Sequence, residues 1–435
     1  MRTLQLRAII GGAWVSIGFG TQKLVQLVSN LILTRLLVPE AFGLMTLANV
    51  ILIGLSMISD IGIKPSIVQN RRGHSIAFLN TAWTLQIVRG FSLWLLACAL
   101  AYPAALLYGE KILFPLICTL GITAAINGFS TTALAVKEKQ VAFGTLTIVQ
   151  TIGSIATLLV TTMLALWLRS VWSLAGGAIA GATINVLIGY WFAPSHRHRL
   201  QIDPEALSAL ARFGRWILLS TLVTYLGGHG IRAFQGALLP ISTFGVLSIA
   251  QTIAWMPGEF VSQIVGAVGF ASLSEVSAKD GNTFNALRKI RAVSLGIAVP
   301  SFIFLALASH EIIGILYDSR YSQAGDYVSL IALAGAVAVL PIGYQNAFLA
   351  EGRSQLQFYI QSFLAVSRIA GMGIGFTLGG VYGLLVGDGL AILSLYPVVA
   401  VLAHKRRILD TTMDTLLLLA VIGSAGLIYW RDYHV

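Results

Sequence analysis

Six charged residues lie inside long apolar stretches of this 435-residue chain, far from the polar segments. Four are basic and two are acidic: Lys23, Arg89, Arg232, Arg368, Glu259 and Asp388. A charge at the centre of a membrane helix costs about 2.5–3.5 kcal/mol on insertion scales, so each should face a cavity or a partner. The cationic excess favours a cavity that binds an anion, because Arg grips phosphate oxygens with two parallel hydrogen bonds and Lys acts as a point charge.

The four cations also have a second interpretation. Arg89 and Arg368 could each form an ion pair with one of the two acids, and Lys23 could pair with another helix. Arg232 lies nearer one face of the membrane and could extend its side chain to that face.

The two acids allow two roles as well. Glu259 follows Pro257-Gly258, a pair that predicts a kink in its helix. Glu259 and Asp388 are therefore candidates either for a protonatable coupling group or for the partner of an arginine.

Amide side chains extend the polar surface around Lys23. Gln22, Gln26 and Asn30 are spaced four residues apart, so they share one helical face with Lys23 at its edge. On this face Gln26 and Asn30 either contact a substrate or join neighbouring helices by hydrogen bonds.

The elements that carry these residues must be membrane helices. The chain is 57% hydrophobic and 10% charged, whereas soluble domains carry about 25% charged residues. Its apolar runs are long and do not alternate, which predicts an all-α polytopic fold and excludes a β-barrel. The net charge of +11 is explained by basic cytoplasmic loops, so no nucleic-acid partner is expected.

About 12–13 transmembrane helices are predicted. The spans are 9–33, 41–63, 79–107, 112–135, 142–167, 171–193, 214–239, 244–270, 292–316, 326–350, 357–378, 380–402 and 413–430. A cytoplasmic linker, 196–212, separates an N-terminal lobe of six helices (1–195) from a C-terminal lobe of six (213–403). Residues 404–435 form a basic cytoplasmic turn and an additional C-terminal helix.

Lys and Arg residues between these spans predict the orientation. With the N-terminus in the cytoplasm, nineteen fall on the inner side and five on the outer side. The five are Arg35, Lys111, Arg169, Arg320 and Arg431. We therefore expect a multi-pass membrane protein with a cytoplasmic N-terminus.

An internal repeat relates the two lobes. Phe42-Gly43 and Phe244-Gly245 are 244 − 42 = 202 residues apart, and the same offset joins Trp14 to Trp216 and Asn30 to Arg232. Six spans lie between equivalent positions, so both copies enter the membrane from the same side. Parallel repeats of this kind predict a transporter with a central cavity at the lobe interface and alternating access.

The corner between the first two spans carries a family resemblance. The stretch Leu33 to Gly43 reads LTRLLVPEAFG, and Asp60-Ile61-Gly62-Ile63 ends the second span. The chain resembles the Wzx-type polysaccharide (O-antigen) flippases of the multidrug/oligosaccharidyl-lipid/polysaccharide (MOP) exporter superfamily, although Ile231 replaces an acid that family members often carry. The resemblance implies a MOP/MATE-like fold. It also implies a location in the bacterial inner membrane and an undecaprenyl-diphosphate-linked oligosaccharide as cargo. The implied role is surface polysaccharide (O-antigen or exopolysaccharide) biosynthesis, with a polysaccharide polymerase as a partner.

Two other functions are alternatives to a flippase. A MATE-like ion-coupled drug or metabolite antiporter would need a dominant buried carboxylate, and the first span has Lys23 and no acid. A membrane glycosyltransferase or polymerase would need long extramembrane loops. The sequence shows no nucleotide-binding loop and no metal-ligand spacing, so neither catalytic residues nor a cofactor are expected. Gly371-Met372-Gly373-Ile374-Gly375 is interpreted as a site of close helix packing.

Overall fold

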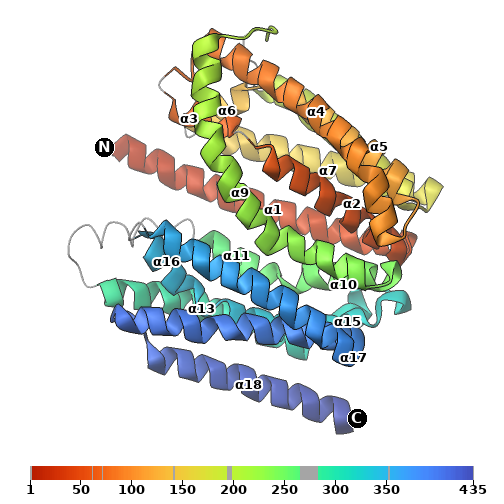
Figure 1. Cartoon of the computed structure of the whole chain (residues 1–435), viewed down its shortest axis with the longest axis vertical. Coiled ribbons are helices and arrows are strands. Elements are labelled where there is room, and N and C mark those ends of the chain that lie inside the picture. Colours follow the sequence, from red (N-terminus) through yellow and green to blue (C-terminus); the bar gives the residue numbers. More distant parts are fainter. Residues whose placement is uncertain are drawn as a thin grey trace. The chain divides into compact units, whose positions relative to one another are not determined.

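The computed structural model describes residues 2–60, 62–70, 72–140, 143–193, 198–264, 283–350 and 353–434. Every regular element within these ranges is a helix, as the sequence predicts (Figure 1). Of the helices in the searched part of the chain, seven are long and apolar enough to cross a membrane, or up to nine if two bent pairs each form one span. The protein is therefore an all-α, multi-pass membrane protein.

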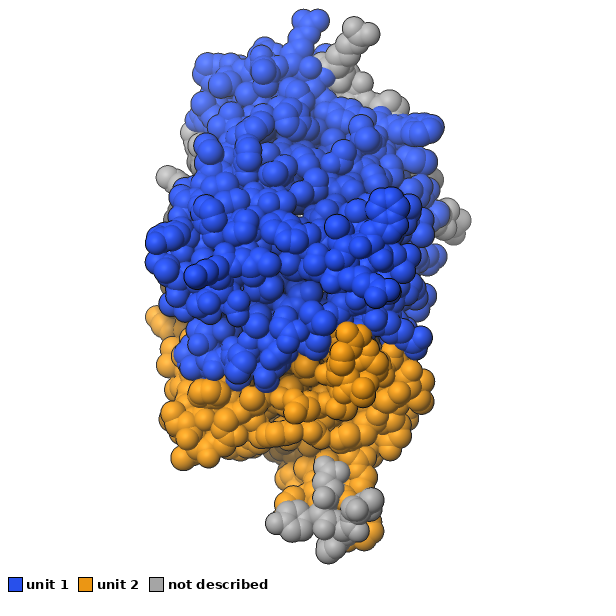
Figure 2. All heavy atoms as spheres, turned by 90° about the vertical axis from the view of Figure 1, so that its right-hand side faces the viewer, with its two compact units in different colours: residues 1–245 blue, residues 246–435 orange. Residues whose placement is uncertain are grey.

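The chain forms two compact units, residues 1–245 and 246–435 (Figure 2). Unit 1 contains α1 (Arg2–Leu36), α2 (Pro39–Ile58), α3 (Ile63–Gln69), α4 (Ile76–Tyr108), α5 (Leu113–Gly128), α6 (Ala133–Lys139), α7 (Phe143–Leu168), α8 (Val171–Phe192), α9 (Pro204–Leu238) and the start of α10 (Ile241–Ala254). Unit 2 contains the rest of α10, α11 (Met256–Ile264), α13 (Thr283–Leu307), α14 (Ser309–Leu316), η2 (Ser319–Tyr321), α15 (Ala324–Ala338), α16 (Ile342–Ala350), α17 (Ser354–Lys405) and α18 (Thr411–His434).

The helix bounds follow the predicted repeat. Helix α1 covers residues 2–36 and α9 covers 204–238, so both ends are offset by 202 residues. Helices α2 and α10 begin at Pro39 and Ile241, again 241 − 39 = 202 residues apart. The repeat seen in a few sequence pairs is thus confirmed in the bounds of α1 and α9 and in the starts of α2 and α10.

The repeated Phe-Gly pair marks a close contact between the two corners of unit 1. A Cβ atom at Gly43 would collide with the carbonyl oxygen of Ile241, and one at Gly245 with the carbonyl oxygen of Pro39. The two contacts are equivalent under the 202-residue offset. Glycine at both positions lets the backbones at the starts of α2 and α10 approach each other.

Within unit 1, α4 packs along α5, α7 packs along both α8 and α1, and α2 packs against α9 (Figure 1). The Ser75 hydroxyl caps α4 by accepting a hydrogen bond from the Phe78 amide at 3.3 Å. Gly109 ends the same helix in the left-handed conformation, with φ of 69°. These local signals fix the length of α4, which carries Arg89.

The predicted span 112–135 is not one straight helix. Helices α5 and α6 meet at 63°, with a break between Gly128 and Ala133. The freed Phe129 carbonyl accepts hydrogen bonds from the Tyr190 hydroxyl at 2.8 Å and the Trp83 indole at 3.4 Å. The break is tolerated because neighbouring side chains satisfy the exposed backbone.

Two further predicted spans are interrupted. The span 326–350 bends by 42° between α15 and α16, at Pro341, which lacks the amide hydrogen that a continuous helix needs. In the predicted span 244–270 the helix breaks at Trp255, two residues before Pro257, and residues beyond 264 lie outside the described ranges.

Part of the predicted linker 196–212 is helical. Helix α9 begins at Pro204, and the Asp203 carboxylate caps it by accepting from the Ala206 amide at 3.0 Å. Residues 194–197 lie outside the described ranges.

Helix α17 is a hairpin of two antiparallel helices. Its turn is Gly379-Gly380, where Gly380 has φ of 58° and ψ of −136°, a conformation open essentially to glycine alone. Gly371 faces the backbone of Gly387, and Gly375 faces that of Gly383, with no room for a Cβ on either helix. This confirms the close helix packing predicted for the glycines around residue 373.

Candidate functional site

Arg89 lies on α4 at the wall of a cavity of about 310 Å³ formed by α2, α4 and α5 in unit 1. Its Nε donates to the Ser59 hydroxyl at 3.1 Å, and its Nη2 donates to the Ser56 carbonyl oxygen at 2.7 Å. Both partners are neutral groups at the C-terminal end of α2, where unsatisfied carbonyls favour a cation. The guanidinium is thus held in place by α2 rather than by an ion pair with Glu259 or Asp388.

The rest of this cavity wall is strongly polar for a membrane helix bundle. The polar residues that line it with Arg89 are Asn49, Ser56, Gln86, Thr123 and Asn127. Leu52, Ile53 and Leu93 supply apolar parts of the wall. Asn127 is exposed and Gln86 is half-buried, so the cavity opens on the side of α5.

A second cavity of about 180 Å³ lies next to the first, because Gln86 lines both. Its polar wall includes Gln150 of α7 and the hydroxyls of Ser130 and Thr132 at the break between α5 and α6. The Gln86 Oε1 atom is buried and accepts no hydrogen bond from the described part of the chain.

Lys23 lies on α1 within a local polar group. Its Nζ donates to Gln26 Oε1 at 3.1 Å and lies 5.7 Å from the centre of the Phe19 ring. The neighbouring Gln22 donates to Gln150 Oε1 at 3.0 Å, which ties α1 to α7. The amide face predicted on α1 is therefore in contact with the wall of the second cavity through Gln150.

The remaining unit 1 candidates lie further along α1 and α9. Asn30 and Arg232, which the repeat makes equivalent, are both half-buried. One turn before Arg232, the His229 ring stacks on Tyr225, whose hydroxyl donates to the Val50 carbonyl at 3.2 Å and so joins α9 to α2.

Of the two predicted acids, Glu259 is exposed in the first turn of α11. Asp388 is buried in the α17 hairpin and forms a two-pronged ion pair with Arg368. The Arg368 Nε and Nη2 atoms donate to Asp388 Oδ1 and Oδ2 at 2.7 and 2.8 Å. The structure thus shows Arg368 and Asp388 paired with each other, which is the second of the two roles considered for each of them.

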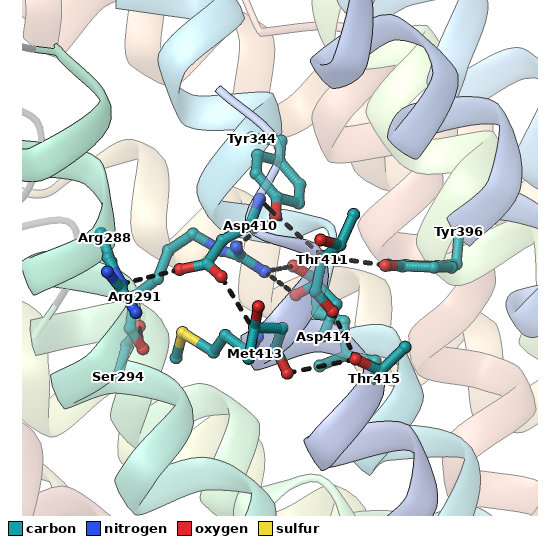
Figure 3. Close-up of polar contacts among 12 residues, drawn as sticks. Arg288, Arg291, Ser294, Tyr344, Tyr396, Asp410, Thr411, Met413, Asp414 and Thr415 are labelled. Atoms are coloured by element: carbon teal, nitrogen blue, oxygen red, sulfur yellow. Dashed lines mark hydrogen bonds and ion pairs between the residues drawn. The ribbon is translucent and has the colours of Figure 1, made fainter. Parts of the chain in front are cut away.

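A buried polar network in unit 2 was not predicted (Figure 3). The Arg291 Nη2 atom lies 2.5 Å from Asp414 Oδ1, and both side chains are 1% exposed. The hydroxyls of Tyr344 and Tyr396 each donate to Asp414 Oδ2 at 2.8 Å. The network joins α13, α16, α17 and α18.

This network was not predicted because Arg291, directly before the predicted span 292–316, was included among the nineteen basic residues of the cytoplasmic side. The signal was present: Arg288 and Arg291 are three residues apart, and Asp410 and Asp414 are four apart. Both pairs stand at the start of an apolar helix, where i, i+3 and i, i+4 residues share a face. Arg288 Nε pairs with Asp410 Oδ2 at 2.9 Å, which completes the match.

The chain is similar to proteins of polysaccharide assembly and to MOP transporters. It is 23% identical over 396 residues to the lipopolysaccharide biosynthesis protein WzxC of Escherichia coli (strain K12), covering 88% of this chain and 78% of that protein. An inward-facing multidrug resistance MATE family transporter of the MOP superfamily superposes with a TM-score of 0.72 at 14% identity, over 88% of this chain and 94% of the other. The lipid II flippase MurJ in an inward closed conformation gives a TM-score of 0.67 at 15% identity, over 96% and 99%.

These structural similarities establish a MOP/MATE-like fold, in agreement with the fold that the sequence resemblance implied. The family profile described as "Polysaccharide biosynthesis protein" matches residues 32–326, more than half of the chain. The chain belongs to this polysaccharide biosynthesis protein family.

Proposed function

We propose that this protein is a flippase that carries a polyprenyl-diphosphate-linked oligosaccharide from the inner to the outer leaflet of the bacterial cytoplasmic membrane. The observation that carries the proposal is the Arg89 cavity. A guanidinium and several amides line a hollow inside a membrane helix bundle of a polysaccharide biosynthesis family member. A buried cation suits an anionic head group, and amides suit the hydroxyls of sugars.

The diphosphate would be held by the cations of unit 1. Lys23 and Arg232 are the residues assigned to it, with Gln26 and Asn30 as additional donors, while Arg89 would contact the head group from the cavity between α2, α4 and α5. Arg368 contributes least, because Asp388 already neutralises it. The Escherichia coli relative is named a lipopolysaccharide biosynthesis protein. The resemblance in sequence adds an undecaprenyl diphosphate carrier and a polysaccharide polymerase as the partner that receives the product.

Transport would proceed by alternating access of two parallel lobes, 1–195 and 213–403, while the lipid tail stays in the bilayer. The charge count places the N-terminus in the cytoplasm, so the corners at Gly43 and Gly245 lie on the outer side. Their reciprocal backbone contact would close the outer end and would have to separate for release.

A drug or metabolite antiporter of the MOP type fits the carboxylates less well. Such a protein needs a buried acid available to bind a cation or a proton. Asp388 is held by both donors of the Arg368 fork, and Glu259 is exposed. Helix α1 offers Lys23 in place of an acid within its membrane-spanning part.

The proposal is tested in cells by replacing Lys23 and Arg232 with Ala, singly and together. Loss of a hydrogen bond to a charged group costs about 1.5–3 kcal/mol, so each variant should lower glycan export on the order of tenfold or more. Lipid-linked oligosaccharide should accumulate on the inner leaflet. Arg72→Ala is the matched control, because Arg72 is 58% exposed and pairs with Glu205 outside the spans.

Unchanged export in both cation variants would refute their assignment to the diphosphate. The topology has its own test, a reporter enzyme fused after Arg199. It should be active only in the cytoplasm, and activity outside the cell would refute the orientation.

A further inference from the structure

The cavity between α2, α4 and α5 contains hydrogen-bonding groups that the described part of the chain leaves unused. The side chains of Asn49, Gln86 and Asn127 line it, and the Gln86 Oε1 atom is buried and accepts no hydrogen bond from any described residue. Arg89 directs Nε and Nη2 to Ser59 and Ser56, so its Nη1 edge is not used by any described residue. Buried polar groups are almost always hydrogen-bonded, so the buried Gln86 Oε1 atom indicates a ligand that donates a hydrogen bond in this cavity.

The chemistry of these groups defines the ligand. A primary amide offers one acceptor oxygen and two donor hydrogens, which matches a sugar hydroxyl that both donates and accepts. Three such amides around one hollow suit a ring with several hydroxyls. The apolar parts of the wall, Leu52 and Leu93, suit the C–H faces of that ring.

The remaining edge of Arg89 adds a requirement for negative charge. A guanidinium donates its strongest hydrogen bonds to a carboxylate or phosphate oxygen. Ser56 and Ser59 already occupy part of the fork of Arg89, which leaves one edge for one anionic group. One edge is sufficient for a single carboxylate.

The volume of the cavity fits one sugar. At about 310 Å³ the cavity is at the lower end of the roughly 300–1,000 Å³ of small-molecule sites. A site of this size accommodates one pyranose, and further sugars of the cargo would extend through the open side.

We infer that this cavity is a subsite for one acidic monosaccharide of the cargo, such as a uronic acid. Asn49, Gln86 and Asn127 bind its hydroxyls, and Arg89 binds its carboxylate. The inference rests on the proposed function, since it assigns the cavity to the sugar and leaves the diphosphate to Lys23 and Arg232.

Binding of free sugars to the purified full-length protein in lipid nanodiscs tests this assignment without requiring transport. Glucuronate, glucose and inorganic phosphate are titrated at millimolar concentrations, with saturation-transfer NMR as the readout. Glucuronate should bind on the order of tenfold to a hundredfold more tightly than glucose, because glucose lacks the charge-assisted bond to Arg89. Phosphate should not displace glucuronate.

Three variants separate the roles. Arg89→Gln should remove the preference for glucuronate over glucose while keeping weak binding of both. Asn127→Ala, at the exposed side of the cavity, and Gln86→Ala should weaken both sugars about equally. Asn185→Ala is the control, because that amide donates to the Gly181 carbonyl at 2.9 Å on α8, outside the cavity.

Each result has a defined consequence. The inference is overturned if the wild-type protein binds neither sugar, if phosphate competes fully with glucuronate, or if Arg89→Gln retains the preference. Flipping of lipid-linked oligosaccharide without sugar binding would refute the subsite alone. Sugar binding without flipping would instead refute the proposed function.

Discussion

Replacing Asp414 by Asn should strongly destabilise the second unit of the protein. The carboxylate of Asp414 accepts from Arg291 at 2.5 Å and from the hydroxyls of Tyr344 and Tyr396 at 2.8 Å. Asn keeps the shape but removes the charge, so Arg291 remains as a cation with 1% exposure and no counter-charge. Breaking a buried ion pair in this way costs about 3–5 kcal/mol.

Thermal unfolding of the purified protein in one detergent measures this effect. For a folding unit of 150–250 residues, 1 kcal/mol corresponds to about 2–4 °C, so we expect the midpoint to fall by about 6–20 °C. Protease sensitivity between α17 and α18 should rise as well, because the network joins α18 to α13 and α16.

Two further variants test whether this loss of stability comes from the buried charge. Arg288→Ala removes a 56% exposed cation that pairs with Asp410, the residue before α18, so it should cost less than Asp414→Asn. The double variant Arg291→Met with Asp414→Leu should recover most of the loss, since no charge remains buried. If Asp414→Asn costs no more than Arg288→Ala, the network does not hold α18 in place.

Two further substitutions follow from close backbone contacts and one from an ion pair. Gly245→Val places a side chain against the Pro39 carbonyl and should abolish transport with little change in expression, measured as surface polysaccharide beside membrane protein level. Gly375→Leu should separate the α17 hairpin and lower the unfolding midpoint, and normal stability would contradict the contact with Gly383. Arg368→Ala should cost more than its double variant with Asp388→Ala in the same unfolding assay, because the single change leaves a buried carboxylate unpaired.

Span positions were the most predictable property of this chain. Helix length in a bilayer is set by membrane thickness, so apolar runs near 20 residues locate the helices well. The bends at Phe129 and Pro341 were not predicted. A hydropathy profile carries no information on where neighbouring side chains can form hydrogen bonds to the backbone groups that a helix break exposes. The repeat was visible in the Phe-Gly pairs, but the reason for the glycines emerged only from the contact between the corners.

The sequence indicated which residues belong to special environments, but it did not indicate which residues they contact. A charge in an apolar run signals a special environment, and Arg89 and Arg368 were selected on that ground. Helix packing determines which of the two faces a cavity. Arg89 donates to the Ser56 carbonyl at the cavity wall, whereas Arg368 is neutralised by Asp388, which lies 388 − 368 = 20 residues further along the α17 hairpin. The cavity amides were missed because Asn and Gln also join membrane helices by hydrogen bonds, so an amide in an apolar run does not by itself indicate a cavity.

Reconstitution of the purified protein into vesicles that carry a fluorescent polyprenyl-diphosphate oligosaccharide is the most direct test of flippase activity. A membrane-impermeant glycosidase added outside digests only sugars on the outer leaflet. With the wild-type protein, we expect digestion to proceed from about half of the lipid toward completion, and Lys23→Ala with Arg232→Ala should slow this on the order of tenfold or more. Digestion that stops at the same half with and without the wild-type protein would contradict a flippase.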